Sequence, residues 1–225
     1  MSSLCKFHPD RPAIGPCDRC GTFGCADCLP LSGTQRLCPD CRARIGSDLP
    51  PLGGRASLAK MGLLGTGAAG LLLSGFEVAM GDNPPDDHPL MLLFGLAGLG
   101  YLAIFIGTIV VFLRWFHLAT RYAHARGGAQ DITPGWAVGW WFIPFANLVK
   151  PFNHTRSMLS ATGGNAGMVG AWQATWILGN MVSNASSRIN NSALSLASGV
   201  MLLAAAFFGM KVIEEVTRSS AGSQG

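Results

Sequence analysis

The stretch that decides the fold lies between Leu90 and Leu113 and has the sequence LMLLFGLAGLGYLAIFIGTIVVFL. It contains no charged side chain, and about 20 apolar residues in an α-helix are enough to cross the hydrocarbon core of a bilayer. Three other stretches are mainly apolar, at residues 61–80, 168–184 and 194–212, although the first contains Glu77 and the last contains Lys211. The sequence therefore predicts an α-helical integral membrane bundle with four spans.

The composition of the whole chain agrees with a membrane protein. Of its 225 residues, 49% are hydrophobic and only 12% are charged, whereas roughly 25% of the residues in a soluble domain are charged. The formal net charge of +4 is modest, which argues against a broad basic face for nucleic acid. We therefore expect the lipid bilayer, and no nucleic acid, as a partner.

The charges of the loops predict the orientation. The loop after the first span, GDNPPDDHP at residues 81–89, contains three Asp and no Lys or Arg, which is typical of the outer face of a membrane. The first residues contain no apolar segment of the kind found in a signal peptide. We expect a multi-pass protein of the cell (inner) membrane, with its N-terminal module and both termini in the cytosol.

The helix of the second span is expected to continue past Arg114 into the headgroup region. The polar residues there recur on one face of the helix and the apolar residues on the other, as in an interfacial amphipathic helix. The polar face holds Arg114, His117, Arg121 and His124, and the apolar face holds Trp115, Phe116, Leu118 and Tyr122.

An aromatic segment follows at residues 133–152, with the sequence TPGWAVGWWFIPFANLVKPF. Thr133 is predicted to cap a helix whose first residue is Pro134. The apolar part, residues 135–149, is short for a span, and Pro144 interrupts it. Because Trp and other aromatic residues are enriched at membrane interfaces, we predict an interfacial or re-entrant helical segment. A fifth span is the alternative.

All seven cysteines lie in the N-terminal part of the chain, and with His8 they form four pairs that have the same two-residue gap: Cys5/His8, Cys17/Cys20, Cys25/Cys28 and Cys38/Cys41. Such a pair presents two ligands to one metal ion, so the four pairs supply eight ligands for two tetrahedral Zn²⁺ ions. Because every ligand position would be filled by protein, we expect structural zinc. Sequential and interleaved pairing are both sterically allowed.

The predicted domains are a zinc-binding module at residues 1–45, a Pro/Gly linker at 46–59, a multi-pass membrane domain at 60–215 and a flexible tail at 216–225. So small a module needs metal to fold, and its minimal core is predicted to contain Phe7, Ile14, Phe23, Leu29 and Leu37. With two Zn²⁺ ions and seven thiolates, the net charge of residues 1–55 is near −1. This charge favours a protein partner over nucleic acid.

Two parts of the chain resemble known families. The stretches CKFHPDRPA, CDRCGTFGCADC and CPDC within residues 5–41 resemble the B-box-type zinc finger. That resemblance implies a cross-brace of interleaved pairs, with Cys5, His8, Cys25 and Cys28 on one ion and Cys17, Cys20, Cys38 and Cys41 on the other. The stretches RWFHLATRYAHA and HTRSMLSAT, with the aromatic segment between them, resemble the uncharacterised bacterial membrane family domain of unknown function 4328. This second resemblance covers about residues 60–215 and implies a multi-pass fold without a known reaction.

Small and polar residues within the spans predict how the helices pack. The pairs Gly65/Ala69, Gly70/Ser74 and Ala103/Gly107 lie four residues apart and would allow close approach of the helices. Gln173, Asn180 and Asn184 share one helical face, where amides form hydrogen bonds between helices or line a hydrated path. Glu77 lies near the outer end of its helix and is expected to reach the interface.

No Gly-rich phosphate loop, carboxylate pair or catalytic triad is recognisable in the sequence. An intramembrane protease would need a nucleophilic Ser with a His base, and the five histidines lie outside the predicted spans. We therefore expect a scaffold, recruitment or signalling protein, not an enzyme, whose cytosolic zinc module contacts a protein partner. A small-solute transporter or channel is the alternative, and an intramembrane enzyme is the weaker one.

Overall fold

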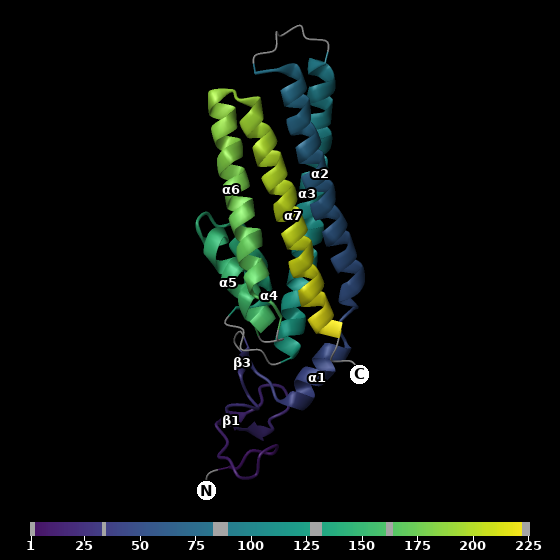
Figure 1. Cartoon of the computed structure of the whole chain (residues 1–225). Coiled ribbons are helices and arrows are strands. Elements are labelled where there is room, and N and C mark those ends of the chain that lie inside the picture. The colour runs from purple at the N-terminus through teal and green to yellow at the C-terminus, as the bar shows by residue number, and fades with distance from the viewer. Residues whose placement is uncertain (1–2, 33–34, 83–89, 127–131, 161–163, 222–225) are drawn as a thin grey trace. The chain divides into compact units, whose positions relative to one another are not determined.

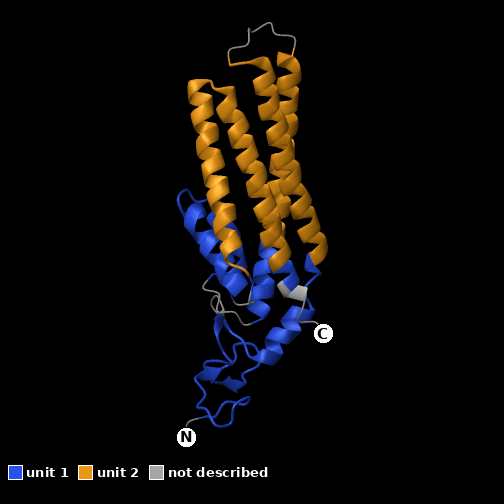
Figure 2. Ribbon diagram, viewed as in Figure 1, with its two compact units in different colours: residues 1–52, 116–164, 216–225 blue, residues 53–115, 165–215 orange. Residues whose placement is uncertain are grey.

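A computed structural model describes residues 3–32, 35–82, 90–126, 132–160 and 164–221. The chain divides into two compact units (Figure 2). Unit 1 contains residues 1–52, 116–164 and 216–225, and unit 2 contains residues 53–115 and 165–215. Figure 1 shows that the described residues are mostly helical and that their short strands lie in the N-terminal region.

Three helices are long and apolar enough to cross a membrane: α2 (Leu52–Met80), α3 (Met91–Ala125) and α7 (Ser192–Ala221). They contain three of the four predicted spans. The fourth predicted span forms a continuous helix, α6 (Gly167–Ile189), but α6 is not among the helices that meet this criterion in the described part of the chain. Length and composition therefore support a membrane protein with three crossing helices.

The helices of unit 2 pack closely where glycines meet. A Cβ atom added at Gly67 of α2 would lie 3.0 Å from the Cβ of Ala206 in α7, and one at Gly199 would lie 3.2 Å from the Cα of Leu71. The predicted close approach at Gly65 and Gly70 is present, since these residues face Ile104 and Tyr101 of α3. The same prediction was wrong for the pair Ala103/Gly107, which is exposed.

Helices α6 and α7 form an antiparallel hairpin. Asn190 ends α6 in the left-handed conformation, with a φ of 48°, and α7 begins two residues later. A Cβ at Gly179 would lie 3.0 Å from Leu202 Cδ2, and one at Gly209 would lie 3.0 Å from Trp172 Nε1. The two helices therefore stay in contact from the turn back to Trp172, roughly 25 Å along α6.

Two of the three amides predicted to bond between helices, Asn180 and Asn184, bond to their own helix. Asn180 Nδ2 donates to the carbonyl of Trp176 at 2.7 Å, and Asn184 Nδ2 donates to the carbonyl of Asn180 at 2.8 Å. Both side chains are exposed. A carbonyl four residues back is always within reach in a helix, so the local bond satisfies the amide without a neighbouring helix.

The aromatic segment forms two short pieces in unit 1. Thr133 caps α4 (Pro134–Gly139) as predicted, because its side chain accepts a hydrogen bond from the backbone N–H of Trp136. A 3₁₀ turn, η1 (Trp140–Phe142), follows, and α5 (Ala146–Ser160) begins after a break at residues 143–145. The segment is therefore not one helix over residues 135–149.

The apolar face of the last turns of α3 is buried by protein. The helix continues past Arg114 to Ala125, as predicted. Phe116, Leu118 and Tyr122 are almost inaccessible. Trp141 and His154 pack edge-on against Phe116, with ring centroids 5.8 Å and 5.7 Å away. The predicted division into a polar and an apolar face is present, since Arg114 and Arg121 are exposed, but the apolar face packs against protein within unit 1.

The stretch predicted as a Pro/Gly linker is mostly helical. Helix α1 (Pro39–Ser47) extends into it and α2 begins at Leu52, so only residues 48–51 lie outside a helix. Within unit 1, the carbonyl of Pro50 accepts a hydrogen bond from Tyr122. A Cβ at Gly46 would lie 3.6 Å from the Cβ of Ala125. The segment at the end of the N-terminal module therefore contacts α3 through a hydrogen bond and through close packing.

Candidate metal centre

Each Cys or His pair lies on a tight turn of the N-terminal module. The hairpin of β1 (Gly15–Pro16) and β2 (Phe23–Gly24) carries the Cys17/Cys20 pair in its loop, and the Cys25/Cys28 pair follows β2 directly. A second hairpin, β3 (Leu31–Ser32) with β4 (Gln35–Arg36), leads to Cys38, the N-cap of α1. Gly21, with a φ of 74°, supplies the left-handed turn after Cys20.

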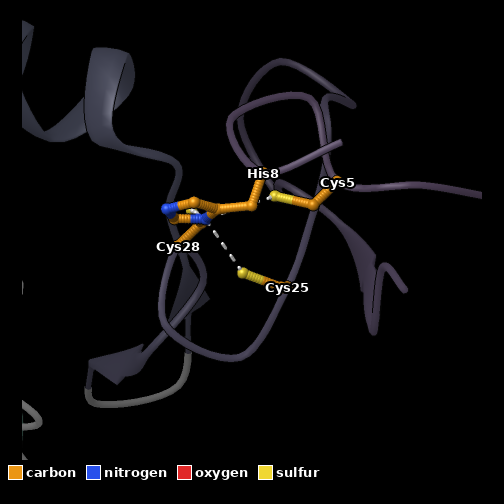
Figure 3. Close-up of side chains that lie close together, drawn as sticks. All are labelled: Cys5, His8, Cys25 and Cys28. Atoms are coloured by element: carbon orange, nitrogen blue, oxygen red, sulfur yellow. Dashed lines mark hydrogen bonds between the residues drawn. The ribbon is translucent and has the colours of Figure 1, made fainter. Parts of the chain in front are cut away.

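The first cluster consists of Cys5, His8, Cys25 and Cys28. All four ligand atoms lie within 4.8 Å of one another, and Figure 3 shows the side chains pointing toward a common centre. His8 Nδ1 is 3.4 Å from Cys25 Sγ, 3.2 Å from Cys28 Sγ and 4.0 Å from Cys5 Sγ. The three cysteines are buried and the imidazole is half-buried.

The second cluster consists of Cys17, Cys20, Cys38 and Cys41, whose sulfur atoms also lie within 4.8 Å of one another. Cys20 Sγ is 3.6 Å from Cys38 Sγ. The backbone N–H of Cys38 donates to Cys17 Sγ at 3.3 Å, which stabilises the charged form of that sulfur. All but Cys20 are buried.

These distances fit tetrahedral metal sites. Sulfur atoms at about 2.3 Å from a tetrahedral ion lie about 3.8 Å apart, and a sulfur and an imidazole nitrogen lie slightly closer. The distances of 3.2–4.0 Å from His8 Nδ1 to the three sulfur atoms of the first cluster have this size. The clusters join the first pair to the third and the second pair to the fourth, so the chain folds in the interleaved arrangement and not the sequential one.

The protonation of the thiols depends on local burial and hydrogen bonding. Burial raises the pKa of Cys28 and of Cys41 to about 12. By contrast, a hydrogen bond with the hydroxyl of Thr22 lowers the pKa of Cys20 to about 6. A cation would have to displace protons from the buried thiols, so its binding is linked to pH.

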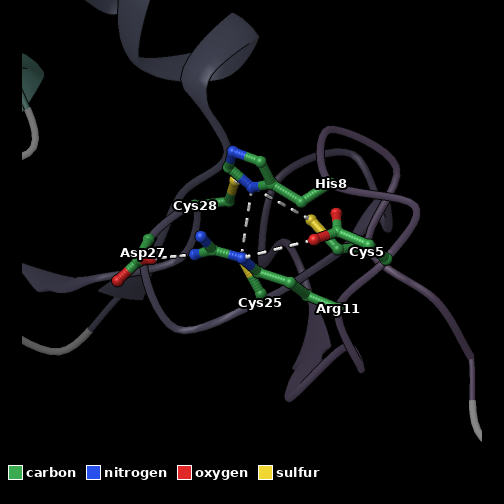
Figure 4. A network of polar contacts seen from close by, with 7 residues as sticks. Cys5, His8, Arg11, Cys25, Asp27 and Cys28 are labelled. Atoms are coloured by element: carbon green, nitrogen blue, oxygen red, sulfur yellow. Dashed lines mark hydrogen bonds and ion pairs between the residues drawn. The ribbon is translucent and has the colours of Figure 1, made fainter.

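Two arginines beside the clusters were not identified from the sequence. Arg11 Nη1 lies 2.5 Å from Asp27 Oδ2 and joins the His8 turn to the Cys25/Cys28 turn, as Figure 4 shows. Arg42 of α1 is half-buried, which lowers its pKa, while the sulfur atoms of Cys28, Cys38 and Cys17 favour its charged form. No local pattern marks these pairings, because they arise only when the turns interleave.

The apolar core of the module is smaller than predicted. Leu29 is fully buried, and Phe7 and Leu37 pack against the clusters. Ile14 and Phe23, also predicted as core, are 49% and 45% exposed. The ligand sulfur atoms occupy the space that larger apolar side chains would fill in an ordinary core.

Comparison with protein families matches residues 91–218 to a family described as Domain of unknown function (DUF4328). The module lies outside this match, and no B-box family matches it. No curated protein and no solved structure matches the chain.

Proposed function

Because this chain belongs to the family Domain of unknown function (DUF4328), a description that names no reaction, we propose a role from its own residues. It is a multi-pass membrane protein whose N-terminal module binds two structural zinc ions and recruits a protein partner. The observation that carries this proposal is the pair of complete four-ligand clusters at the start of a chain with apolar, membrane-length helices.

The donor sets support zinc. Three thiolates with one imidazole, and four thiolates, are common donor sets of structural zinc sites. Both sites are closed by four protein ligands, so neither leaves a position for a substrate. Metal binding would supply much of the folding free energy of this module, on the order of 10 kcal/mol per site. We therefore propose a structural role, and no catalytic one, for the ions.

The exposed apolar residues of the module support a protein partner. Ile14 precedes β1 and Phe23 begins β2, and the backbone N–H of Ile14 bonds to Gly24, so the two residues lie on adjoining segments of one hairpin. Exposed apolar side chains that lie close together on a surface indicate a contact with a partner. We call Ile14 and Phe23 the hairpin patch and propose that the partner contacts it.

The attachment of α1 to α3 supports signalling or scaffolding over simple tethering. Cys38 and Cys41 lie at the start of α1, whereas Gly46 near its end packs on Ala125. The hydroxyl of Tyr122 donates a hydrogen bond to the carbonyl of Pro50, in the segment that follows α1. A partner bound to the module would therefore act on a helix that itself continues into the apolar span.

We further propose that α6 also crosses the membrane, which gives four spans with both termini in the cytosol. The contact between α6 and α7 continues for most of the hydrocarbon thickness of ~30 Å. In unit 2 the basic residues Arg55, Lys60, Arg114 and Lys211 lie toward one end of the antiparallel helices, whereas Arg188, Glu77 and Asp82 lie toward the other. The positive-inside rule then places the first end in the cytosol, as expected for the cell (inner) membrane.

A transporter or channel is the second candidate function, and one contact favours it. Glu77 of α2 accepts a hydrogen bond from Ser195 of α7, and a carboxylate within a membrane helix often marks an ion path. Against it, Asn180 and Asn184 are exposed and bonded to their own helix. The recruitment proposal therefore has the stronger support.

Affinity purification of the full-length protein from gently solubilised membranes tests the recruitment proposal. A double variant, Ile14→Ser with Phe23→Ser, should lose the partner and keep two zinc ions, because neither residue is in the core. Cys17→Ser should lose both the partner and at least one ion. Recovery of the same partner with Cys17→Ser would show that the module does not recruit it.

A further inference from the structure

The break between η1 and α5 exposes large apolar side chains on unit 1. Phe142 is 69% exposed and Phe145 is 84% exposed, and Trp136 and Val149 on either side are also exposed. We call these four residues the aromatic tip. Four large apolar side chains exposed within residues 136–149 of a membrane protein indicate an interaction surface.

The backbone holds Phe145 outward at a conformational cost. Its φ is 63°, a left-handed value that is uncommon for a bulky residue. The N–H of Ala146 donates to the carbonyl of Pro144 at 2.7 Å, and the N–H of Asn147 donates to Ile143 at 3.0 Å. The turn is therefore hydrogen-bonded on both sides of Phe145. Glycine would adopt this conformation without strain. The presence of an exposed Phe side chain at this strained position therefore indicates a functional role for the ring.

The packing of this segment on α3 sets its depth. Trp141 contacts Phe116, and His154 bonds to Thr120 at 3.0 Å. These α3 residues follow the uncharged stretch that ends at Leu113, and at 1.5 Å per residue they lie about 5–10 Å beyond it. That distance corresponds to the headgroup region of a bilayer. The aromatic tip is thus carried by elements that pack at the membrane surface.

The charges around the tip fit an anionic headgroup. Residues 132–160 contain no Asp or Glu. Lys150 is exposed, with its Nζ 5.5 Å from the centre of the Trp140 ring, and Trp140 in turn lies 5.4 Å from Trp136. An ammonium group held beside interfacial indoles is placed to meet a lipid phosphate while the rings enter the acyl region.

We propose that the aromatic tip inserts into the membrane leaflet on the side of the N-terminal module, with Phe142 and Phe145 among the acyl chains and Lys150 at the phosphate of an anionic phospholipid. The proposal rests on the four-span topology proposed above, which places the segment on the cytosolic side. It assigns to this segment a lipid partner and not a second copy of the chain or another protein.

Photo-crosslinking in the full-length, zinc-loaded protein tests the insertion. Benzoylphenylalanine replaces Phe145 or Phe142 in separate preparations, and it replaces Phe23 of the module as a matched exposed control. In vesicles of phosphatidylcholine and phosphatidylglycerol, mass spectrometry should find lipid adducts at the first two positions and none at Phe23. Adducts to protein at positions 142 and 145, or no lipid adduct at either, would overturn the proposal.

Replacing Lys150 separates the charge from the insertion. In equal mixtures of the two lipids, phosphatidylglycerol adducts at position 142 should exceed phosphatidylcholine adducts about fivefold, the enrichment expected from one basic residue at the surface. Lys150→Gln should reduce this ratio to about one and leave total lipid adducts unchanged. An unchanged ratio would show that Lys150 does not contact the lipid phosphate. Lipid adducts form on whichever side of the membrane the aromatic tip lies, so their absence shows a failure of insertion and not a wrong topology. A wrong topology is detected separately, by labelling introduced cysteines in intact cells.

Discussion

Tyr122 donates a hydrogen bond from its hydroxyl to the backbone carbonyl of Pro50, 3.1 Å away and 72 positions earlier in the chain. This bond joins the segment after the N-terminal module to the last turns of α3. It is the contact that a flexible linker would lack.

Tyr122→Phe should therefore loosen the segment after α1 without releasing metal. The variant removes the hydrogen bond between the buried Tyr122 and the carbonyl of the exposed Pro50, at a cost of about 1 kcal/mol. Amide hydrogen exchange of residues 46–52 should become several-fold faster, while metal analysis still finds two ions per chain. A loss of zinc would mean that the segment supports the clusters directly.

The metal content is the second prediction. The purified full-length protein should contain two zinc ions per chain, and Cys17→Ser should leave one or none, because the interleaved turns share one fold. Chelation should expose the module to proteolysis within residues 1–47, since its apolar core is limited to a few side chains. Retention of a protease-resistant module after complete removal of metal would contradict this dependence.

The Cys and His pairs that form the two clusters could be predicted from the sequence, because the two-residue gap within each pair is a local feature. Spacing alone left the grouping of the pairs open, and only the resemblance to a B-box indicated the interleaved one. Ile14 and Phe23 were misplaced because residue type alone does not tell which apolar side chains a metal-centred core excludes. The same limit applies to Asn180 and Asn184, since a helical amide can bond to its own backbone or to a neighbour with equal local geometry.

The structure of the aromatic segment could be predicted only in part from the sequence. Thr133 and Pro134 predicted the start of α4 correctly, because capping depends on adjacent residues. The left-handed turn at Phe145 carries no such signal, since glycine or asparagine would be expected there. The elements on either side of this turn pack on α3 through Trp141 and His154, and such contacts between distant parts of the chain cannot be recognised from local sequence.

Helix packing in unit 2 gives the third prediction. Gly199→Val should destabilise the bundle by about 1–3 kcal/mol, because even the Cβ would lie 2.8 Å from Ser74 Oγ and 3.2 Å from the Cα of Leu71. Gly75→Val in α2 is the matched control, since nothing lies within 4 Å of its added Cβ. Thermal unfolding in detergent should show a lower midpoint for the first variant only. Equal effects would indicate a helix-propensity cost instead of a steric one.

The buried histidine of α5 gives a pH dependence. Burial, with a smaller contribution from the charge of His124, lowers the pKa of His154 to about 4, compared with about 6.5 for an exposed histidine. The undocked state of α5 therefore binds a proton between these values and the docked state does not. Docking of α5 on α3 should be unaffected above pH 6.5 and weaken as the pH falls toward 4, by roughly 3 kcal/mol at most.

Hydrogen exchange of residues 146–160 between pH 7 and pH 5, corrected for intrinsic rates, measures this weakening. His154→Gln keeps a polar group near Thr120 and does not titrate, so its corrected exchange should be independent of pH over this range. If the wild-type protein and the variant respond identically, another group is responsible.

The last prediction concerns the number of spans, and three introduced cysteines decide it. Asn153 and Ser187 are exposed, and Thr217 lies near the end of α7. Each is replaced by Cys in turn and treated in intact cells with a membrane-impermeant thiol reagent.

In the four-span topology only position 187 is outside, because α6 and α7 turn there. Three spans, with α6 on the cytosolic side, would leave position 187 protected and expose position 217. A fifth span through residues 135–149 would expose both 153 and 217 and protect 187. The native cysteines lie in the module on the cytosolic side in every case, so the parent protein should remain unlabelled. We expect labelling at position 187 alone, because the basic residues of unit 2 gather at the opposite helix ends and the α6–α7 contact is nearly as long as the hydrocarbon core is thick.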